Sequence, residues 1–80
     1  MNEIMVYTKS GCPQCVATKR ALQSAAIPYR SVDVTADPAA RAEVLSLGYS
    51  AVPVVVLADG RHWAGFRPDK IARLVAHKAA

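Results

Sequence analysis

The chain has 80 residues, a formal net charge of +4 and two cysteines. This length predicts a single domain over residues 1–80 with a small core. The basic residues are scattered and never form a run, and one Trp, three Tyr and one Phe give little material for base stacking. The composition therefore argues against nucleic-acid binding and fits a solvated surface that tolerates an acidic protein partner.

The first residues and the apolar stretches predict neither export nor membrane insertion. The first residues, "MNEIMVYTK", contain an acid and a very short apolar run, unlike a signal peptide. The longest apolar stretch, "AVPVVVLA" at 51–58, is too short to span a bilayer. We therefore expect a cytoplasmic protein, in a compartment where disulfides are mostly transient and catalytic.

The first half of the chain predicts strand, helix, strand, helix. "EIMVY" at 3–7 and "PYRSVDV" at 28–34 have strand patterns, and a helix is expected between them from Cys12 or Pro13 to about Ala26. A second helix is expected from the N-cap Asp37 to Gly48, where glycine suits the position after the helix end.

The second half predicts a hairpin and a last helix. "VPVVVL" at 52–57 is a continuous β-branched run, typical of a strand buried on both faces. "ADG" at 58–60 predicts a turn, "RHWAG" at 61–65 a short strand, and "PDKIARLVAHK" at 68–78 an amphipathic helix. The order β-α-β-α-β-β-α predicts an α/β fold, a four-stranded mixed sheet with helices on both faces.

The cysteines lie three residues apart, at the junction of the first strand and the first helix. This spacing is close to one helical turn, so the two sulfurs can meet on one side. The unpaired N–H groups at the helix start favour a thiolate at Cys12, and Lys9 adds positive charge. We expect Cys12 to be the exposed nucleophile and Cys15 the deeper thiol that resolves a mixed disulfide.

Other interpretations of the pair stay open. A CxxC is half of a zinc site, but the only further ligands would be His62 and His77, at spacings that match no zinc finger. The pair could also bridge an iron–sulfur cluster between subunits, or be inert. A CxxC within a βαβ unit favours redox chemistry, so we expect no metal.

A proline at the start of a buried strand is unusual, because it removes a hydrogen-bond donor from the sheet. A cis peptide between Val52 and Pro53 would explain it and would leave the Val52 backbone free to pair with an extended peptide. A trans proline at the first residue of the strand is the alternative.

Together these motifs resemble the thioredoxin/glutaredoxin fold over nearly the whole chain, and "HWAGFRPDKI" at 62–71 resembles the signature of the NrdH-redoxins. That resemblance implies a cis Val52–Pro53 bond, a nucleophile at Cys12 and a resolving thiol at Cys15. It implies a monomeric thiol–disulfide oxidoreductase without a bound cofactor. Electrons would come from NADPH through thioredoxin reductase and pass to ribonucleotide reductase, at its NrdE-type large subunit.

The resemblance also implies which residues surround the dithiol. Lys9, Pro13, Gln14, Val52 and Pro53 would support the active site. We expect Trp63 and Phe66 to wall a groove beside Cys12 and Arg67 to lie at its rim, although Trp63 could instead be a core residue. The partner-binding stretch is expected to comprise Trp63, Ala64, Gly65, Phe66, Arg67, Pro68 and Asp69.

The same stretch differs from that of glutathione-dependent glutaredoxins, the nearest alternative. Their usual Gly-Gly-x-Asp-Asp is replaced by Gly65-Phe66-Arg67-Pro68-Asp69, which adds bulk and removes an acid; Lys9 alone fits the ligand's carboxylate. Two positions depart from the NrdH pattern as well: Pro13 stands where valine is common, and Ala64 where serine is usual.

Overall fold

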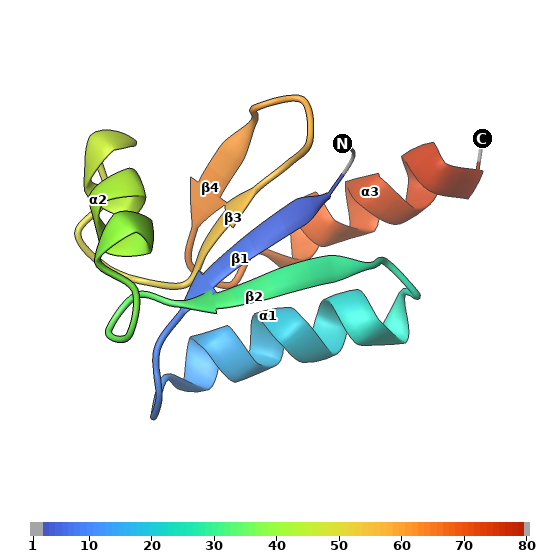
Figure 1. Ribbon diagram of the computed structural model, residues 1–80. Helices are drawn as coiled ribbons and strands as arrows, with labels where there is room; N and C mark the ends of the chain where they lie inside the picture. Colours follow the sequence, from blue (N-terminus) through green and yellow to red (C-terminus); the bar gives the residue numbers. More distant parts are fainter. Residues whose placement is uncertain (1–2, 80) are drawn as a thin grey trace.

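The computed structural model describes residues 3–79, with side chains as far as Val75. Within this range the chain forms the seven expected elements in the expected order (Figure 1). They are β1 (Ile4–Thr8), α1 (Pro13–Ser24), β2 (Tyr29–Asp33), α2 (Pro38–Ser46), β3 (Val54–Val56), β4 (His62–Ala64) and α3 (Pro68–Ala79).

The strands form one mixed sheet in the order β2-β1-β3-β4. β1 and β2 are parallel, with Ile4 opposite Tyr29, while β3 runs antiparallel to both β1 and β4. A parallel pair needs a crossover connection, which α1 supplies, whereas β3 and β4 are joined by a short turn as a hairpin. The predicted α/β thioredoxin-like architecture is confirmed.

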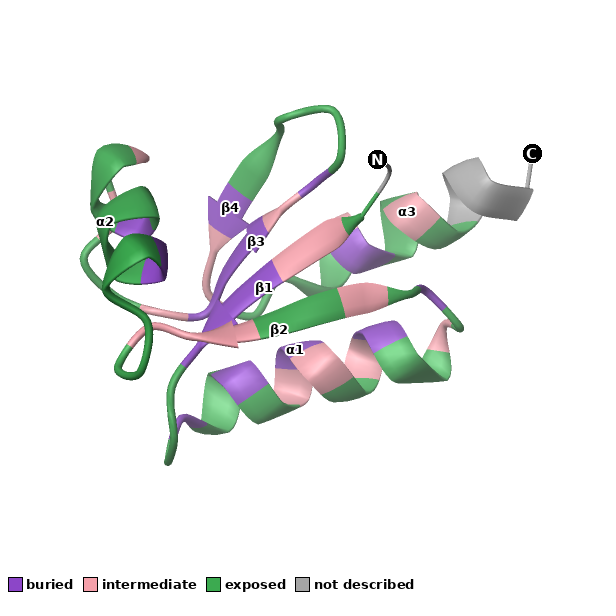
Figure 2. Ribbon diagram, in the orientation of Figure 1, coloured by how far each residue is buried: buried purple, intermediate pink, exposed green. Residues whose placement is uncertain are grey.

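The helices cover both faces of the sheet. In Figure 1, α1 and α3 lie together on one face and α2 lies on the other. Because side chains alternate along a strand, Val6 and Val55 enter the core under α1 and α3, while Tyr7 and Val54 enter the core under α2. The buried positions of the strands therefore converge on the centre of the sheet (Figure 2).

Several element boundaries differ from the sequence-based expectation by one or two residues, most clearly those of the third strand. The third strand, expected over 52–57, is confined to Val54–Val56. Pro53 has no N–H to donate, and the Val52–Pro53 bond is cis, as the resemblance implied. At the other end of the strand, the Leu57 N–H donates to the Arg61 carbonyl at 2.8 Å. This hydrogen bond belongs to the turn between β3 and β4, so Leu57 lies outside the strand.

Both α1 and α2 begin with a proline directly after a capping side chain. Asp37 caps α2 as predicted: its Oδ1 accepts from Ala39 N at 3.0 Å and from Ala40 N at 3.2 Å. Gly48 follows the last turn of α2 with φ +93°, a conformation that glycine adopts without strain. In α1 the capping residue is Cys12, which places the first cysteine at the helix start.

None of the helices in the described part of the chain has the length and apolar character needed to cross a membrane.

Candidate active site

Cys12 is held by the start of α1 and by the loop that precedes β3. Its sulfur accepts a hydrogen bond from Cys15 N at 3.2 Å, in the manner of an N-cap side chain. Its thiol donates to the Val52 carbonyl, with the sulfur 3.8 Å from the oxygen. These two contacts fix the Cys12 sulfur between the first turn of α1 and the cis-proline loop.

The expectation that Cys12 is exposed is wrong. The residue is only 9% exposed, because its sulfur turns inward against the Val52 carbonyl instead of outward from the loop. Both cysteines are free thiols in this structure. Access to the Cys12 sulfur is therefore restricted, and a disulfide substrate has to be presented in a narrow range of orientations.

Cys15 is the deeper of the two thiols, as predicted. It is 1% exposed, and burial raises its pKa above the ordinary value, with a further rise from its hydrogen bond to the Cys12 sulfur. The nearby Thr8 hydroxyl and the Lys9 backbone lower the pKa, but by less than burial raises it. Cys15 therefore stays protonated while Cys12 reacts, which suits a resolving thiol.

Thr8, at the end of β1, is a site residue that the sequence did not indicate. Its hydroxyl is buried and has no hydrogen-bond partner within the described structure. It nevertheless lies near enough to Cys15 to lower the pKa of that thiol. An unpaired donor beside a thiol is available to the thiolate that forms when the thiol loses its proton. A threonine at a strand end fits β propensity equally well, so nothing in the sequence singles it out.

Replacing Thr8 with Val should separate stability from function. The isosteric change removes a buried hydroxyl without a partner, so we expect the free energy of unfolding to stay equal or rise by about 1 kcal/mol. The pKa of Cys15 should rise further, and resolution of a mixed disulfide should slow several-fold. Urea unfolding and stopped-flow release of a thiol partner measure the two effects. Thr8→Ser, which keeps the hydroxyl, is the control; equal release rates for Thr8→Val and Thr8→Ser would contradict the role.

Three segments distant in the sequence meet beside the dithiol. The Pro53 carbonyl, next to the cis bond, accepts from Gly65 N at 2.8 Å. Gln14, between the cysteines, accepts from Phe66 N through its Oε1 at 3.4 Å. The CxxC turn, the cis-proline loop and the turn after β4 are thus joined. This places Pro13, Gln14, Val52, Pro53, Gly65 and Phe66 around the cysteines.

Gly65 is the residue on which this junction depends. Its φ of +83° disfavours any side chain, and a Cβ would lie 3.5 Å from Gln14 Oε1. We expect Gly65→Ala to lower the free energy of unfolding by about 1–2 kcal/mol, because the left-handed conformation becomes strained. Gly60→Ala is a matched control for the backbone strain alone, since it has φ +94° and nothing within 4 Å of an added Cβ. Only Gly65→Ala should also slow disulfide reduction; equal activity of the two variants would show that the junction is not needed.

A cavity of about 220 Å³ opens between the dithiol loop and α2. Lys9 and Arg41 bring two cations to it, and Val52 and Leu45 provide apolar surface; Val34, Thr35, Val44, Ser50 and Ala51 complete the lining. The sequence indicated Lys9 but not Arg41, because only the packing of α2 on the sheet brings the two side chains to one cavity. Among the residues described, no acidic side chain lines this cavity. The cavity therefore suits a carboxylate of a substrate whose sulfur reacts with Cys12.

The "HWAGFRPDKI" stretch divides between core and surface. Trp63, one of the expected groove walls, is 6% exposed and packs in the core with Leu22 and Ile71. Trp63 points inward because β4 alternates, so its neighbour Ala64 faces the α2 side. Phe66, 38% exposed, is the aromatic residue of this stretch that remains on the surface. The predicted partner-binding roles of these residues stay predictions.

Arg67 is exposed, but it is already paired. Its guanidinium donates twice to the Asp69 carboxylate, at 3.2 and 3.0 Å, over the first residues of α3. This pair lowers the pKa of Asp69 and raises that of Arg67. Pro68 is the first residue of α3 and sets its direction. An acidic partner would have to compete with Asp69 for Arg67.

The histidines considered as zinc ligands do not lie together with the cysteines in what the structure describes. His62 Nδ1 is hydrogen-bonded to the Tyr49 hydroxyl at 2.7 Å, and the side chain of His77 lies outside the described residues. Over the described part of the chain, no group of three or more His, Cys, Asp or Glu side chains could hold a metal ion.

Comparison with known proteins agrees with this geometry. The sequence model of the Glutaredoxin family matches residues 4–63. Glutaredoxin-like protein NrdH of Salmonella typhimurium is 42% identical over 71 residues, which are 89% of this chain and 86% of that protein. The corresponding protein of Escherichia coli K12 is 39% identical over the same share of each chain.

Solved structures give the same result. The NrdH-redoxin of Escherichia coli, described as having a thioredoxin-like activity profile, superposes with a TM-score of 0.84 and 39% identity, over 90% of this chain and 93% of that one. The thioredoxin-like protein BC3987 superposes with a TM-score of 0.83 and 38% identity, over 90% of this chain and 99% of that one. With its buried resolving thiol and helix-capping Cys12, the chain belongs to the glutaredoxin family as a glutaredoxin-like NrdH redoxin, a thiol–disulfide oxidoreductase.

Proposed function

We propose that this redoxin carries electrons from NADPH and thioredoxin reductase to ribonucleotide reductase, at its NrdE-type large subunit. The observation that carries the proposal is the hydrogen bond from the Phe66 backbone to Gln14, which brings a residue with an exposed aromatic side chain to the CxxC turn. The likeness to NrdH redoxins, one of them described as thioredoxin-like in its activity, supports the same reductant here.

The proposed reaction is a two-step exchange. The Cys12 thiolate attacks one sulfur of the partner's disulfide, a bond forms between them, and the other partner sulfur leaves as a thiolate. Cys15 then gives up its proton and attacks Cys12, which releases the second partner thiolate and closes the Cys12–Cys15 disulfide. Two electrons pass to the partner. Thioredoxin reductase would reverse the closure, so the cycle needs no bound cofactor.

The turn after β4 favours protein substrates over glutathione. Phe66 stands where a glycine would allow the tripeptide to approach, and Pro68 begins α3 where an acid would meet its amino group. Arg67 is engaged by Asp69, the one acid left of that motif. A glutathione amino group would therefore find its carboxylate already paired.

Glutathione-dependent reduction is the second candidate, and one observation favours it. Lys9 and Arg41 line the cavity beside Val52, so a small carboxylate ligand has two cations to meet. The same cavity would serve the backbone and side chains of a partner peptide. Its presence alone does not separate the two reductants.

A side-by-side reductase assay tests the proposal. Oxidised protein is offered NADPH with thioredoxin reductase, or NADPH with glutathione and glutathione reductase, and insulin is the terminal acceptor. We expect turnover with thioredoxin reductase and little with glutathione. Phe66→Gly is the informative variant, since it should raise glutathione-dependent turnover if the ring excludes the tripeptide. Turnover mainly with glutathione in the wild type would reassign the chain as a glutathione-dependent glutaredoxin.

The setting of this activity is part of the same proposal. A dithiol that cycles with NADPH-driven reductases works in a reducing compartment, so we place the protein in the cytoplasm. It would act as a monomer and meet its partners transiently, as an electron carrier must.

A further inference from the structure

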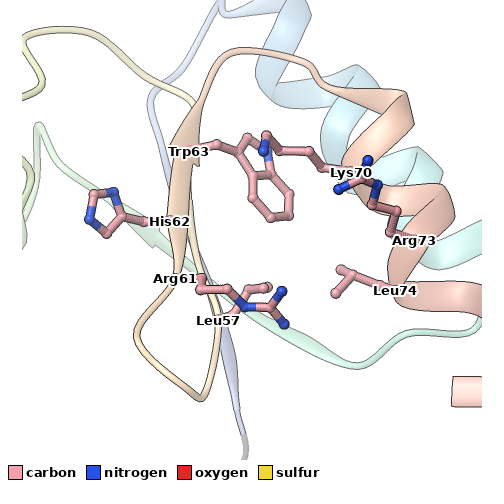
Figure 3. A pocket seen from close by; sticks show the side chains of 7 residues that line it. All are labelled: Leu57, Arg61, His62, Trp63, Lys70, Arg73 and Leu74. Carbon is pink, nitrogen blue, oxygen red and sulfur yellow. The ribbon is translucent and has the colours of Figure 1, made fainter. Parts of the chain in front are cut away.

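A second cavity lies between β4 and α3, away from the dithiol. Its volume is about 250 Å³, and neither cysteine lines it. Trp63, Leu57 and Leu74 form its apolar part (Figure 3). Arg61 reaches it from the turn just before β4, and Lys70 and Arg73 reach it from α3. The imidazole of His62 points away from the cavity, to the other side of β4 (Figure 3).

The charge around this cavity is unbalanced. Arg61 pairs with Asp59, its Nε lying 2.8 Å from the carboxylate, but both side chains are largely exposed and such a pair is weak. Lys70 and Arg73 have no acidic partner among the described residues, and no acid lines the cavity. Lys70 Nζ lies 5.9 Å from the centre of the Trp63 ring instead. A positive rim therefore surrounds an apolar floor.

The volume of the cavity and the residues that line it limit the class of ligand that can bind there. The volume falls below the range of about 300–1,000 Å³ that is usual for small-molecule sites, and suits a single inserted side chain. A free phosphate has no apolar group to pack against Leu57, Leu74 and the indole of Trp63. A nucleic-acid base would need the open face of an aromatic ring, but Trp63 is 6% exposed and Lys70 lies over its ring.

We propose that this cavity is a docking site for an acidic peptide segment of a protein partner. An apolar side chain of the segment enters between Leu57, Leu74 and the edge of Trp63. A carboxylate on one side of it pairs with Arg61. A carboxylate on the other side pairs with Arg73 and Lys70, which lie across the cavity from Arg61. This arrangement satisfies charge complementarity. The site adds a binding function to the redoxin that involves neither thiol, so it stands or falls separately from the choice of electron donor and acceptor.

The chain contains its own reporter, because Trp63 is the single tryptophan and forms part of the cavity wall. The probe is a capped, cysteine-free pentapeptide with a central leucine and two acidic residues on each side. We expect it to change Trp63 emission saturably, and added salt should weaken its binding. Three comparison ligands are used: the same peptide with Asn and Gln for the acids, the acidic peptide with a central glycine, and inorganic phosphate. Each should bind more weakly.

Variants locate the binding. Arg73→Gln and Arg61→Gln should each weaken the peptide roughly fivefold, the effect of losing one exposed charge contact. Arg20→Gln, the same change at an exposed position of α1 that lines neither cavity, is the matched control and should leave the affinity for this peptide unchanged. Amide chemical shifts should move for residues 57–63 and 70–74.

Several results would overturn the proposal. Unchanged Trp63 emission at saturating peptide, or an equal loss of affinity in Arg20→Gln and Arg73→Gln, would show that the peptide does not bind in this cavity. Phosphate binding as tightly as the peptide would make the cavity a free-anion site. None of these measurements depends on turnover, so a failed reductase assay would leave the docking site untouched.

Discussion

Cys12→Ser should reduce protein disulfides at least about a thousandfold more slowly than the wild type, because a hydroxyl at this position has no accessible anionic form. The contacts that position the sulfur would remain available: a serine oxygen can still cap α1 by accepting from Cys15 N. We therefore expect the variant to fold. Insulin reduction followed by turbidity, with thermal unfolding measured in parallel, separates lost chemistry from lost structure.

The remaining thiol provides an internal control for this variant. Burial is the largest cause of the raised pKa of Cys15, and it persists without Cys12. Since a raised pKa leaves less thiolate at a given pH, alkylation of Cys15 should be slow at neutral pH. Its rate should continue to rise at pH values above those at which a free cysteine levels off. A Cys12→Ser protein that still turned over insulin would show that Cys15 can attack directly.

Cys15→Ser should trap the reaction halfway. Attack by Cys12 remains possible, but the mixed disulfide then has no neighbouring thiol to resolve it. Spontaneous release should fall at least about a hundredfold, because an intramolecular thiol is replaced by dilute external ones. Oxidised thioredoxin reductase or an insulin disulfide should form a covalent adduct, visible by mass spectrometry and lost on addition of dithiothreitol.

The order of the two thiols is tested by the reciprocal variant. Cys12→Ser incubated with the same disulfide should form little adduct, since Cys15 is 1% exposed and mostly protonated. Adducts of similar yield from both variants would mean that the two thiols are interchangeable. The difference in burial between Cys12 and Cys15 would then not determine which thiol attacks first. Cys15→Ala checks that the serine hydroxyl itself does not affect the result.

Much of the fold followed from the order of residues alone. Alternation and β-branched runs indicated the strands, and Pro13, Pro38 and Pro68 each stand at the first position of a helix. These are local signals, since the period of a strand and the fixed φ of proline act within a few residues. The CxxC at the strand-to-helix junction likewise indicated the redox pair and which thiol is deeper.

What the tertiary structure decided are the properties that depend on distant segments. The low exposure of Cys12 arises from the Val52 carbonyl, forty residues away. The hydroxyl of Thr8 acquires a role because α1 packs Cys15 against the end of β1.

Trp63 illustrates the same limit for the partner-binding stretch. The motif led us to expect Trp63 on an open groove beside Cys12, whereas packing of α3 over β4 buries the residue and opens a different cavity. Sequence spacing fixes which residues are neighbours along one element. Which side chains are covered, and which cations gather at one cavity, depends on how the elements pack, and that information is not local.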